Sequence, residues 1–116
     1  MYSILDTVKS MCNVAQFDKA FDGDLIVYIN SVFNILTQMG VGPKEGFSIS
    51  DETATWDDYL SGDVSIELLK SYVPMKVKLM FDPPQNGSAL ENLKELVAES
   101  EWRLNVAKDR YPEIEG

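Results

Sequence analysis

Residues 22–40, DGDLIVYINSVFNILTQMG, contain the pattern that decides the fold. Apolar side chains recur along this stretch at intervals of three and four residues, at Leu25, Ile29, Val32, Leu36 and Met39. That spacing places them on one face of a helix. Asp22 stands where an N-cap is expected, and Gly40 is a residue type that commonly ends a helix. We therefore predict a central helix that buries one broad face.

Two shorter helices are indicated on either side of this stretch. Ser3 and Thr55 each stand three residues before an aspartate, which is the spacing of a capping box with Asp in place of Glu. Ser3 predicts a helix over residues 2–12, and Thr55 predicts a short helix over residues 57–60. We expect Trp56, at the start of the short helix, to pack inward.

Two long helices are expected in the C-terminal half. The first starts after Asp63 and keeps its apolar phase on both sides of Pro74, so we expect one kinked helix rather than two. It ends at Asp82, because a residue before a proline is pushed out of the helical conformation. The last helix is expected to begin at the cap Ser88, with Glu91 at the third position.

The expected fold class is mainly α, without a β-core. Four principal helices form an antiparallel, bundle-like single domain over residues 1–110, together with the short extra helix and one long loop from Gly40 to Thr55. Residues 47–49 alternate for too few positions to found more than a two-stranded flap. Residues 111–116 lack periodicity, and we expect a flexible C-terminal tail there.

Composition excludes several classes of function. The chain has 19 Asp and Glu against 10 Lys and Arg, a formal net charge of -9, and no histidine. An acidic surface is unsuited to coating duplex nucleic acid, and the usual general base and metal ligand are missing. The N-terminus has no basic region followed by an apolar one, and no stretch approaches the roughly 18 apolar residues of a membrane span. We therefore expect no signal peptide and no membrane partner.

Local clusters of chemical groups have structural explanations. A calcium loop aligned on Asp18 fails, because Ala20 and Ile29 then occupy ligand positions. The adjacent carboxylates Asp57 and Asp58 suit the positive first turn of a helix without any catalytic role. Cys12 is the sole cysteine and lies on an apolar stripe, so we expect a small buried side chain and no disulfide. No catalytic residue, metal site or cofactor is expected.

Five segments of the sequence are similar to one family. They are Ile29–Phe33, Gln38–Pro43 with Phe47, Trp56–Asp58, Tyr72 through Phe81–Pro84, and Glu101–Asn105. The most distinctive pieces read Phe-Asp-Pro-Pro and Glu-Trp-Arg-Leu-Asn. In these segments the chain resembles the head-tail connector, or adaptor, proteins of long-tailed double-stranded DNA phages.

The resemblance implies a virion structural protein rather than an enzyme. It implies a homo-oligomeric ring in the virion neck, beneath the portal protein, that extends the DNA channel and docks a stopper or tail-completion protein. Genomic DNA would pass through without sequence-specific binding, and the subunits would be present in the host cytoplasm during assembly.

Two sets of residues are candidates for these roles. Aromatic side chains at helix ends, with their neighbours, are candidate interface anchors, since a domain of this size cannot cover all of them. These candidates are Trp56, Tyr59, Phe81, Pro83, Pro84, Trp102 and Arg103. Acidic residues that would repel DNA from the channel wall are Asp51, Glu52, Asp57 and Asp58.

Two other classes of function stay open at this stage. A small acidic helical protein can mimic DNA and inhibit a basic partner, and the net charge of -9 suits that role. Such an inhibitor would bind as a monomer or dimer with a steep salt dependence, whereas a connector joins large symmetric assemblies through partly apolar faces. An enzyme would need carboxylate chemistry without histidine.

Overall fold

Helices make up most of the residues that the computed structural model describes, which are residues 3–59 and 66–110. The helices are α1 (Ile4–Met11), α2 (Asp22–Gln38), α3 (Trp56–Tyr59), α4 (Ile66–Phe81) and α5 (Gly87–Arg110). Within these residues no strand forms, and one isolated bridge pairs Ser3 with Thr55. The mainly α class is confirmed, with four principal helices and one short one. The expected tail, residues 111–116, lies outside the described residues.

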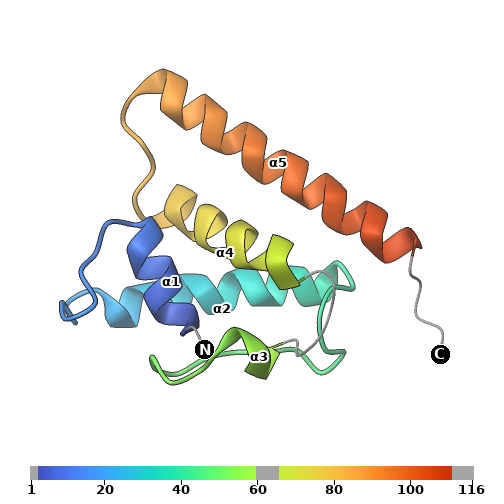
Figure 1. Ribbon diagram of the computed structural model, residues 1–116, viewed down its shortest axis with the longest axis horizontal. Helices are drawn as coiled ribbons and strands as arrows, with labels where there is room; N and C mark the ends of the chain where they lie inside the picture. The colour runs from blue at the N-terminus through green and yellow to red at the C-terminus, as the bar shows by residue number, and fades with distance from the viewer. Residues whose placement is uncertain (1–2, 60–65, 111–116) are drawn as a thin grey trace.

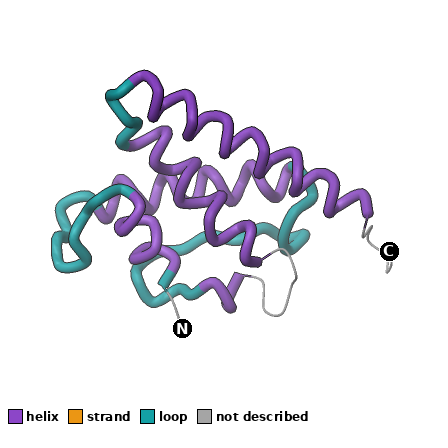
Figure 2. Tube along the Cα trace, turned by 45° about the horizontal axis from the view of Figure 1, so that its top comes forward, coloured by secondary structure: helices purple, strands orange, loops and turns teal. Residues whose placement is uncertain are grey.

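The helices α2, α4 and α5 run in alternating directions, and α1 crosses beside them (Figure 1). α4 is the central element, because it packs against α1, α2 and α5. The long α5 makes its main helix contacts with α4 and forms one side of the molecule, while α3 and the loop before it form the opposite side (Figure 2). No helix in the described ranges is both long and apolar enough to cross a membrane.

The core is built from the apolar stripes that the sequence pattern predicts. The buried residues of α2 are Leu25, Ile29, Val32, Phe33 and Leu36. They meet buried residues of α1 and α4 in one hydrophobic cluster. Trp56 packs inward as expected: 2% of the residue is exposed, and its indole N–H donates to the Thr7 hydroxyl at 3.1 Å. Cys12 is likewise buried, and burial raises the pKa of its thiol.

Two expected helix starts are confirmed by side-chain hydrogen bonds. The Ser3 hydroxyl accepts from the Asp6 backbone N–H at 3.2 Å. At α3 the capping box is reciprocal, because Thr55 Oγ1 accepts from the Asp58 N–H at 3.2 Å and the Asp58 carboxylate accepts from the Thr55 N–H at 2.9 Å. Bonds of this kind stabilise the start of a helix, where the first backbone N–H groups have no partner four residues earlier within the helix.

Two other expected caps are wrong. α2 has Phe21 at its N-cap position with no side-chain hydrogen bond, and Asp22 instead lies in the first turn and accepts from the Lys9 ammonium. At α5 the cap is Asn86 rather than Ser88. The Asn86 side-chain oxygen accepts from the backbone N–H groups of Ser88 and Ala89 at 2.9 and 3.1 Å, so the helix begins at Gly87.

The expected end of α2 and the continuity of α4 match the structure, whereas the expected start of the kinked helix after Asp63 and residue 60 at the expected end of the short helix lie outside the described residues. α2 ends in a Schellman motif, in which Gly40, with φ +87°, donates to Thr37 O and Val41 donates to Leu36 O at 2.8 Å. Pro74 lies inside α4, which is continuous from Ile66 to Phe81 as expected for one helix. The long loop that follows Gly40 has no regular structure up to Thr55, where the isolated bridge forms.

Candidate interaction surfaces

The outward face of α5 carries the most exposed of the predicted aromatic anchors. Among residues 87–106 of this helix, whose side chains the structure describes, the buried ones are Leu93, Val97, Ser100 and Leu104. Trp102 is two residues from both Ser100 and Leu104, which places it about 200° around the helix from each. The indole therefore points away from the core, and 65% of the residue is exposed. We call Ala98, Glu99, Trp102 and Arg103, all exposed, the outer α5 face.

The rotation of α5 about its axis is fixed by a polar cluster on its inner side. The hydroxyl of the buried Tyr72 on α4 donates to the Glu101 carboxylate at 2.8 Å, and the Lys76 ammonium donates to the same oxygen at 3.2 Å. Burial, followed by the bond to Glu101, raises the pKa of Tyr72 far above its usual value, so its hydroxyl stays protonated as a donor. Glu101 thus faces α4 while its neighbour Trp102 faces outward.

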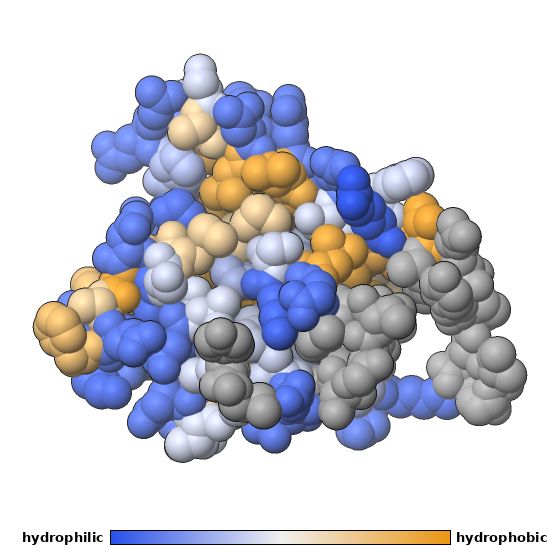
Figure 3. All heavy atoms as spheres, in the orientation of Figure 1, coloured by the Kyte–Doolittle hydropathy of each residue, from blue (hydrophilic) through white to orange (hydrophobic). Residues whose placement is uncertain are grey.

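Apolar side chains also gather along the seam between α4 and α5 (Figure 3). Half-buried residues of α4 that pack against the core are Leu68, Met75, Leu79, Met80 and Phe81. Leu96 on α5 is 51% exposed. Because α4 packs against α1, α2 and α5, the half-buried residues of α4 are explained by packing within the domain.

Phe81 and the two prolines after it occupy the turn between α4 and α5. The Phe81 ring is half-buried and makes edge contacts with Phe21 at 5.5 Å and Tyr28 at 6.2 Å between ring centres. Pro83 is exposed and Pro84 is half-buried. The contact with Phe21 brings this corner next to the loop between α1 and α2, at one end of the long axis of the molecule (Figure 1).

Trp56 and Tyr59 are not surface anchors in this chain. Only 2% of Trp56 and 4% of Tyr59 are exposed, and both rings contact Phe33 of α2. Phe47 of the long loop also packs on Phe33 and Tyr59, so the aromatic cluster holds the loop against α2. The expectation that Trp56 and Tyr59 anchor an interface is corrected, because both rings are buried in the core and are not accessible to a partner.

The most exposed large apolar residue was not among the candidates. Phe17 lies in the α1–α2 loop, residues 12–21, and is 86% exposed. The residues on both sides of it are held by Lys9 of α1, which is fully buried and donates to the carbonyl oxygens of Gln16 and Asp18. The signal in the sequence for this arrangement is a lysine next to the apolar stripe of α1. Its hydrogen-bond partners lie 7 to 13 residues away, so the sequence pattern does not identify them.

The predicted acidic residues all lie on the surface at the side opposite α5. Asp51, Glu52, Asp57 and Asp58 are exposed, on the long loop and in the first turn of α3. Asp51 accepts from the backbone N–H of Thr53 at 2.9 Å and from its hydroxyl, and these bonds lower the pKa of the Asp51 carboxyl. Asp51 therefore keeps its negative charge to more acidic pH than a free aspartate.

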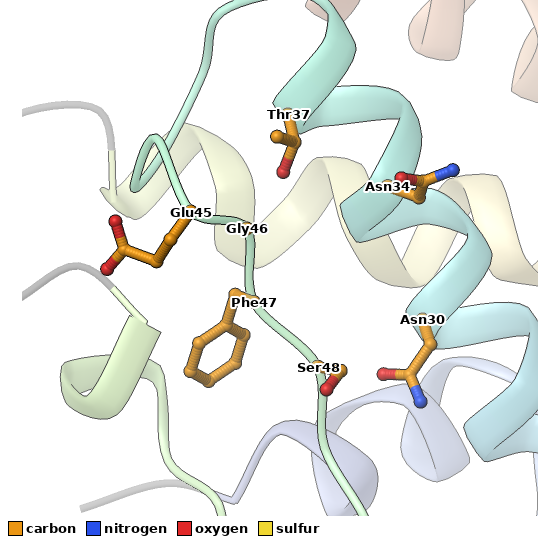
Figure 4. A pocket seen from close by; sticks show the side chains of 7 residues that line it. All are labelled: Asn30, Asn34, Thr37, Glu45, Gly46, Phe47 and Ser48. Atoms are coloured by element: carbon orange, nitrogen blue, oxygen red, sulfur yellow. The ribbon is translucent and has the colours of Figure 1, made fainter.

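One pocket of about 480 Å³ lies between α2 and the long loop (Figure 4). It is lined by Asn30, Asn34, Thr37, Glu45, Gly46, Phe47 and Ser48. The Asn30 amide is already engaged, because it donates to Ile49 O at 3.0 Å and accepts from Ile49 N–H at 2.8 Å. The pocket holds a single ionisable side chain, Glu45, so it lacks the paired groups of an acid–base site.

In the described part of the chain no group of three or more Cys, Asp or Glu is placed to hold a metal ion.

Comparison with known proteins gives one match. The family model described as "Phage connector protein" matches residues 4–111, which is nearly the whole chain. Neither the curated proteins nor the solved structures contain a match. The match includes every described helix and the segments Phe81–Pro84 and Glu101–Asn105 on which the resemblance was based. The chain therefore belongs to the phage connector protein family.

Proposed function

We propose that this connector is a head-tail adaptor. Copies form a ring beneath the portal protein after DNA packaging, extend the DNA channel and dock a stopper or tail-completion protein. The observation that carries the proposal is the family match over residues 4–111. The protein acts in the virion neck as a structural component, and its subunits are present in the host cytoplasm before assembly.

The two remaining sets of candidate anchors support a ring in which each copy contacts its two neighbours through two different surfaces. The Phe81–Pro84 corner lies at one end of the long axis, and the C-terminal half of α5, with Trp102 and Arg103, extends to the other (Figure 1). A closed ring needs two different surfaces on each copy, because each subunit meets one neighbour with one surface and the other neighbour with the second. Anchors at opposite ends suit that requirement.

The acidic residues on the side opposite α5 support a channel that does not retain DNA. We propose that Asp51, Glu52, Asp57 and Asp58 face the lumen. Carboxylates repel the phosphate backbone over a distance of about 8–10 Å at physiological ionic strength. The bonds from Thr53 lower the pKa of the Asp51 carboxyl, so its charge persists to more acidic pH than that of a free aspartate.

Deletion of the gene from the phage that encodes it tests the proposal. Electron microscopy of the lysate is expected to show complete tails beside heads that stay unjoined, and the wild-type gene supplied in trans is expected to restore joining. Normal infectious virions from the deletion would overturn the adaptor role. The acidic inhibitor would then be the function to test, by salt-dependent binding to a basic partner.

A test of the lumen assignment has to remove carboxylates that make no hydrogen bond important for the fold. Asp58 caps α3 and Asp51 orders the loop, so the test variant is Glu52→Gln with Asp57→Asn. Its matched control removes two charges from α5, Glu91→Gln with Glu95→Gln, both exposed. We expect slower DNA ejection from virions that carry the first variant and normal ejection with the second. Equal ejection from both would contradict the lumen assignment and leave the adaptor role intact.

A further inference from the structure

Lys9 is the only charged residue that is buried in the part of the chain that the structure describes. Two of its three bonds go to the α1–α2 loop, and the third goes to the first residue of α2. No part of the side chain is exposed. It donates to Gln16 O at 3.0 Å, to Asp18 O at 2.7 Å and to the Asp22 carboxylate at 2.7 Å. An ammonium has three donors, so all of them are used. The fold therefore places a buried charge where it fixes the α1–α2 loop.

The loop that Lys9 holds presents Phe17 to solvent. The two carbonyl groups that Lys9 binds belong to the residues immediately before and after Phe17, and the Asp18 side chain also accepts from the Ala20 N–H at 3.0 Å. The backbone around the phenylalanine is therefore fixed on both sides, while 86% of the residue is exposed. A preorganised aromatic anchor loses little conformational freedom on binding, which is the usual property of a docking residue.

We propose that Phe17 docks onto the outer α5 face of the next copy of this chain, and that Lys9 is the positioning residue that presents it. This inference rests on the proposed ring, to which it adds the contacting residues. Trp102 and Ala98 form the apolar part of the receiving surface. The contact is heterologous, since the α1–α2 loop of one copy meets α5 of its neighbour.

Position and charge favour a second copy as the partner. The α1–α2 loop lies at one end of a molecule with a longest extent of 42 Å, and the C-terminal half of α5 extends toward the other end (Figure 1). Each surface also carries exposed charges of both signs, Lys19 in the loop and Asp24 in the first turn of α2 on one side, and the ion pair of Glu99 with Arg103, at 2.8 Å, next to Trp102 on the other. Because each surface carries a positive and a negative side chain, the contact does not have to bring like charges together, although the whole chain is acidic.

Disulfide crosslinking tests the contact directly. The double variant Gln16→Cys with Ala98→Cys, at two exposed positions, keeps the Phe17 ring and is oxidised both in purified virions and as the isolated full-length chain. We expect a ladder of covalent oligomers on a non-reducing gel, because every copy carries both halves of the contact. Cys12 does not compete, since it is buried and burial raises the pKa of its thiol.

Control variants separate this contact from others. Gln16→Cys alone is expected to stay monomeric, whereas a covalent dimer would indicate a symmetric contact between loops and overturn the proposal. Gln16→Cys with Ser31→Cys, an exposed position on α2, is also expected to stay monomeric. Absence of the ladder from both virions and the isolated chain overturns the inference, while the gene-deletion result decides the adaptor role separately.

Further substitutions test the roles of Phe17 and Lys9 under conditions in which the helices stay folded. We expect Phe17→Ser to lower the complementation of the deleted phage about tenfold or more, and Phe17→Leu to retain most of it. Lys9→Met in the crosslinking variant is expected to reduce the ladder, measured at a temperature where circular dichroism shows the helices still folded. Full crosslinking in that variant would contradict the positioning role of Lys9.

Discussion

The two long loops of this protein are both fixed by a side chain from a neighbouring helix, but they differ in what else holds them. Lys9 holds the α1–α2 loop through two carbonyl groups, and Asn30 holds the 40–55 loop by pairing with both backbone groups of Ile49. The second loop also buries its own side chains, Val41 and Ile49, in the core. The first leaves Phe17 exposed.

The difference shows how an irregular segment can be ordered with or without a hydrophobic contribution. A loop that buries apolar side chains is held by many small contacts, so one lost hydrogen bond is tolerable. A loop that keeps its largest apolar side chain in solvent depends on a few strong polar bonds. We therefore expect the α1–α2 loop to be far more sensitive to a single substitution than the 40–55 loop.

Lys9→Met is expected to give the largest effect. The substitution leaves the Asp22 carboxylate, with a side-chain exposure of 19%, and two loop carbonyls without their donor. Removing one partner of a buried ion pair costs about 3–5 kcal/mol of unfolding free energy. Urea denaturation followed by circular dichroism measures the loss. A loss below about 1 kcal/mol would show that the loop does not depend on this ammonium.

Gly42→Ala is expected to be the next most damaging change, and it acts on the other loop. Gly42 has φ +91°, and an added Cβ would lie 2.8 Å from the Tyr59 hydroxyl oxygen. Backbone strain of this kind costs about 1–3 kcal/mol, and displacement of the buried Tyr59 adds to it. Gly46→Ala is the matched control, because Gly46 has φ +90° but its nearest contact is 3.8 Å away. Equal melting temperatures for the two variants would contradict the contribution of Tyr59.

Asn30→Ala measures how much the 40–55 loop depends on the two hydrogen bonds between the Asn30 side chain and Ile49. Both backbone groups of Ile49 lose their partner, which costs about 1–3 kcal/mol, less than the loss of Lys9. Asn34→Ala, one turn further along α2 and exposed, is expected to change the stability by less than about 0.5 kcal/mol. If Asn30→Ala destabilised the protein more than Lys9→Met, the comparison between the loops would be reversed.

Local patterns made most of the fold predictable. The helix periodicity of α2 and the reciprocal pair of Thr55 and Asp58 involve residues within a few positions of each other, so the sequence displays them directly. The expected start of α5, with Ser88 as its cap, lies two residues after the observed cap Asn86, because serine and asparagine are both favourable at the N-cap position. The three-residue spacing to Glu91 favoured Ser88, while the observed bonds go to Asn86.

The errors at the candidate surfaces come from contacts that are distant in sequence. Asp22 was expected to cap α2, but its partner is Lys9, thirteen residues away. Phe17 was missed because an isolated aromatic residue in a loop has no periodicity from which to infer exposure. The sequence makes Trp102 a candidate anchor as an aromatic residue near a helix end, while its position opposite the buried face of α5 required the structure.

The smallest expected effect concerns the charge of the 40–55 loop rather than its stability. The Thr53 hydroxyl and backbone N–H bonds lower the pKa of the Asp51 carboxyl. Because its folded pKa lies below its unfolded value, any contribution of this group to stability is present above the unfolded pKa and is lost as the pH falls through the folded pKa.

Thr53→Val removes the hydroxyl bond and is expected to raise the pKa of Asp51 toward its ordinary value, as measured by NMR titration of the carboxyl carbon. The melting temperature at neutral pH is expected to stay unchanged, since Asp51 is fully exposed. An unchanged titration curve would mean that Thr53 does not hold the charge of this loop, and the 40–55 loop would then be ordered by Asn30 and its buried side chains alone.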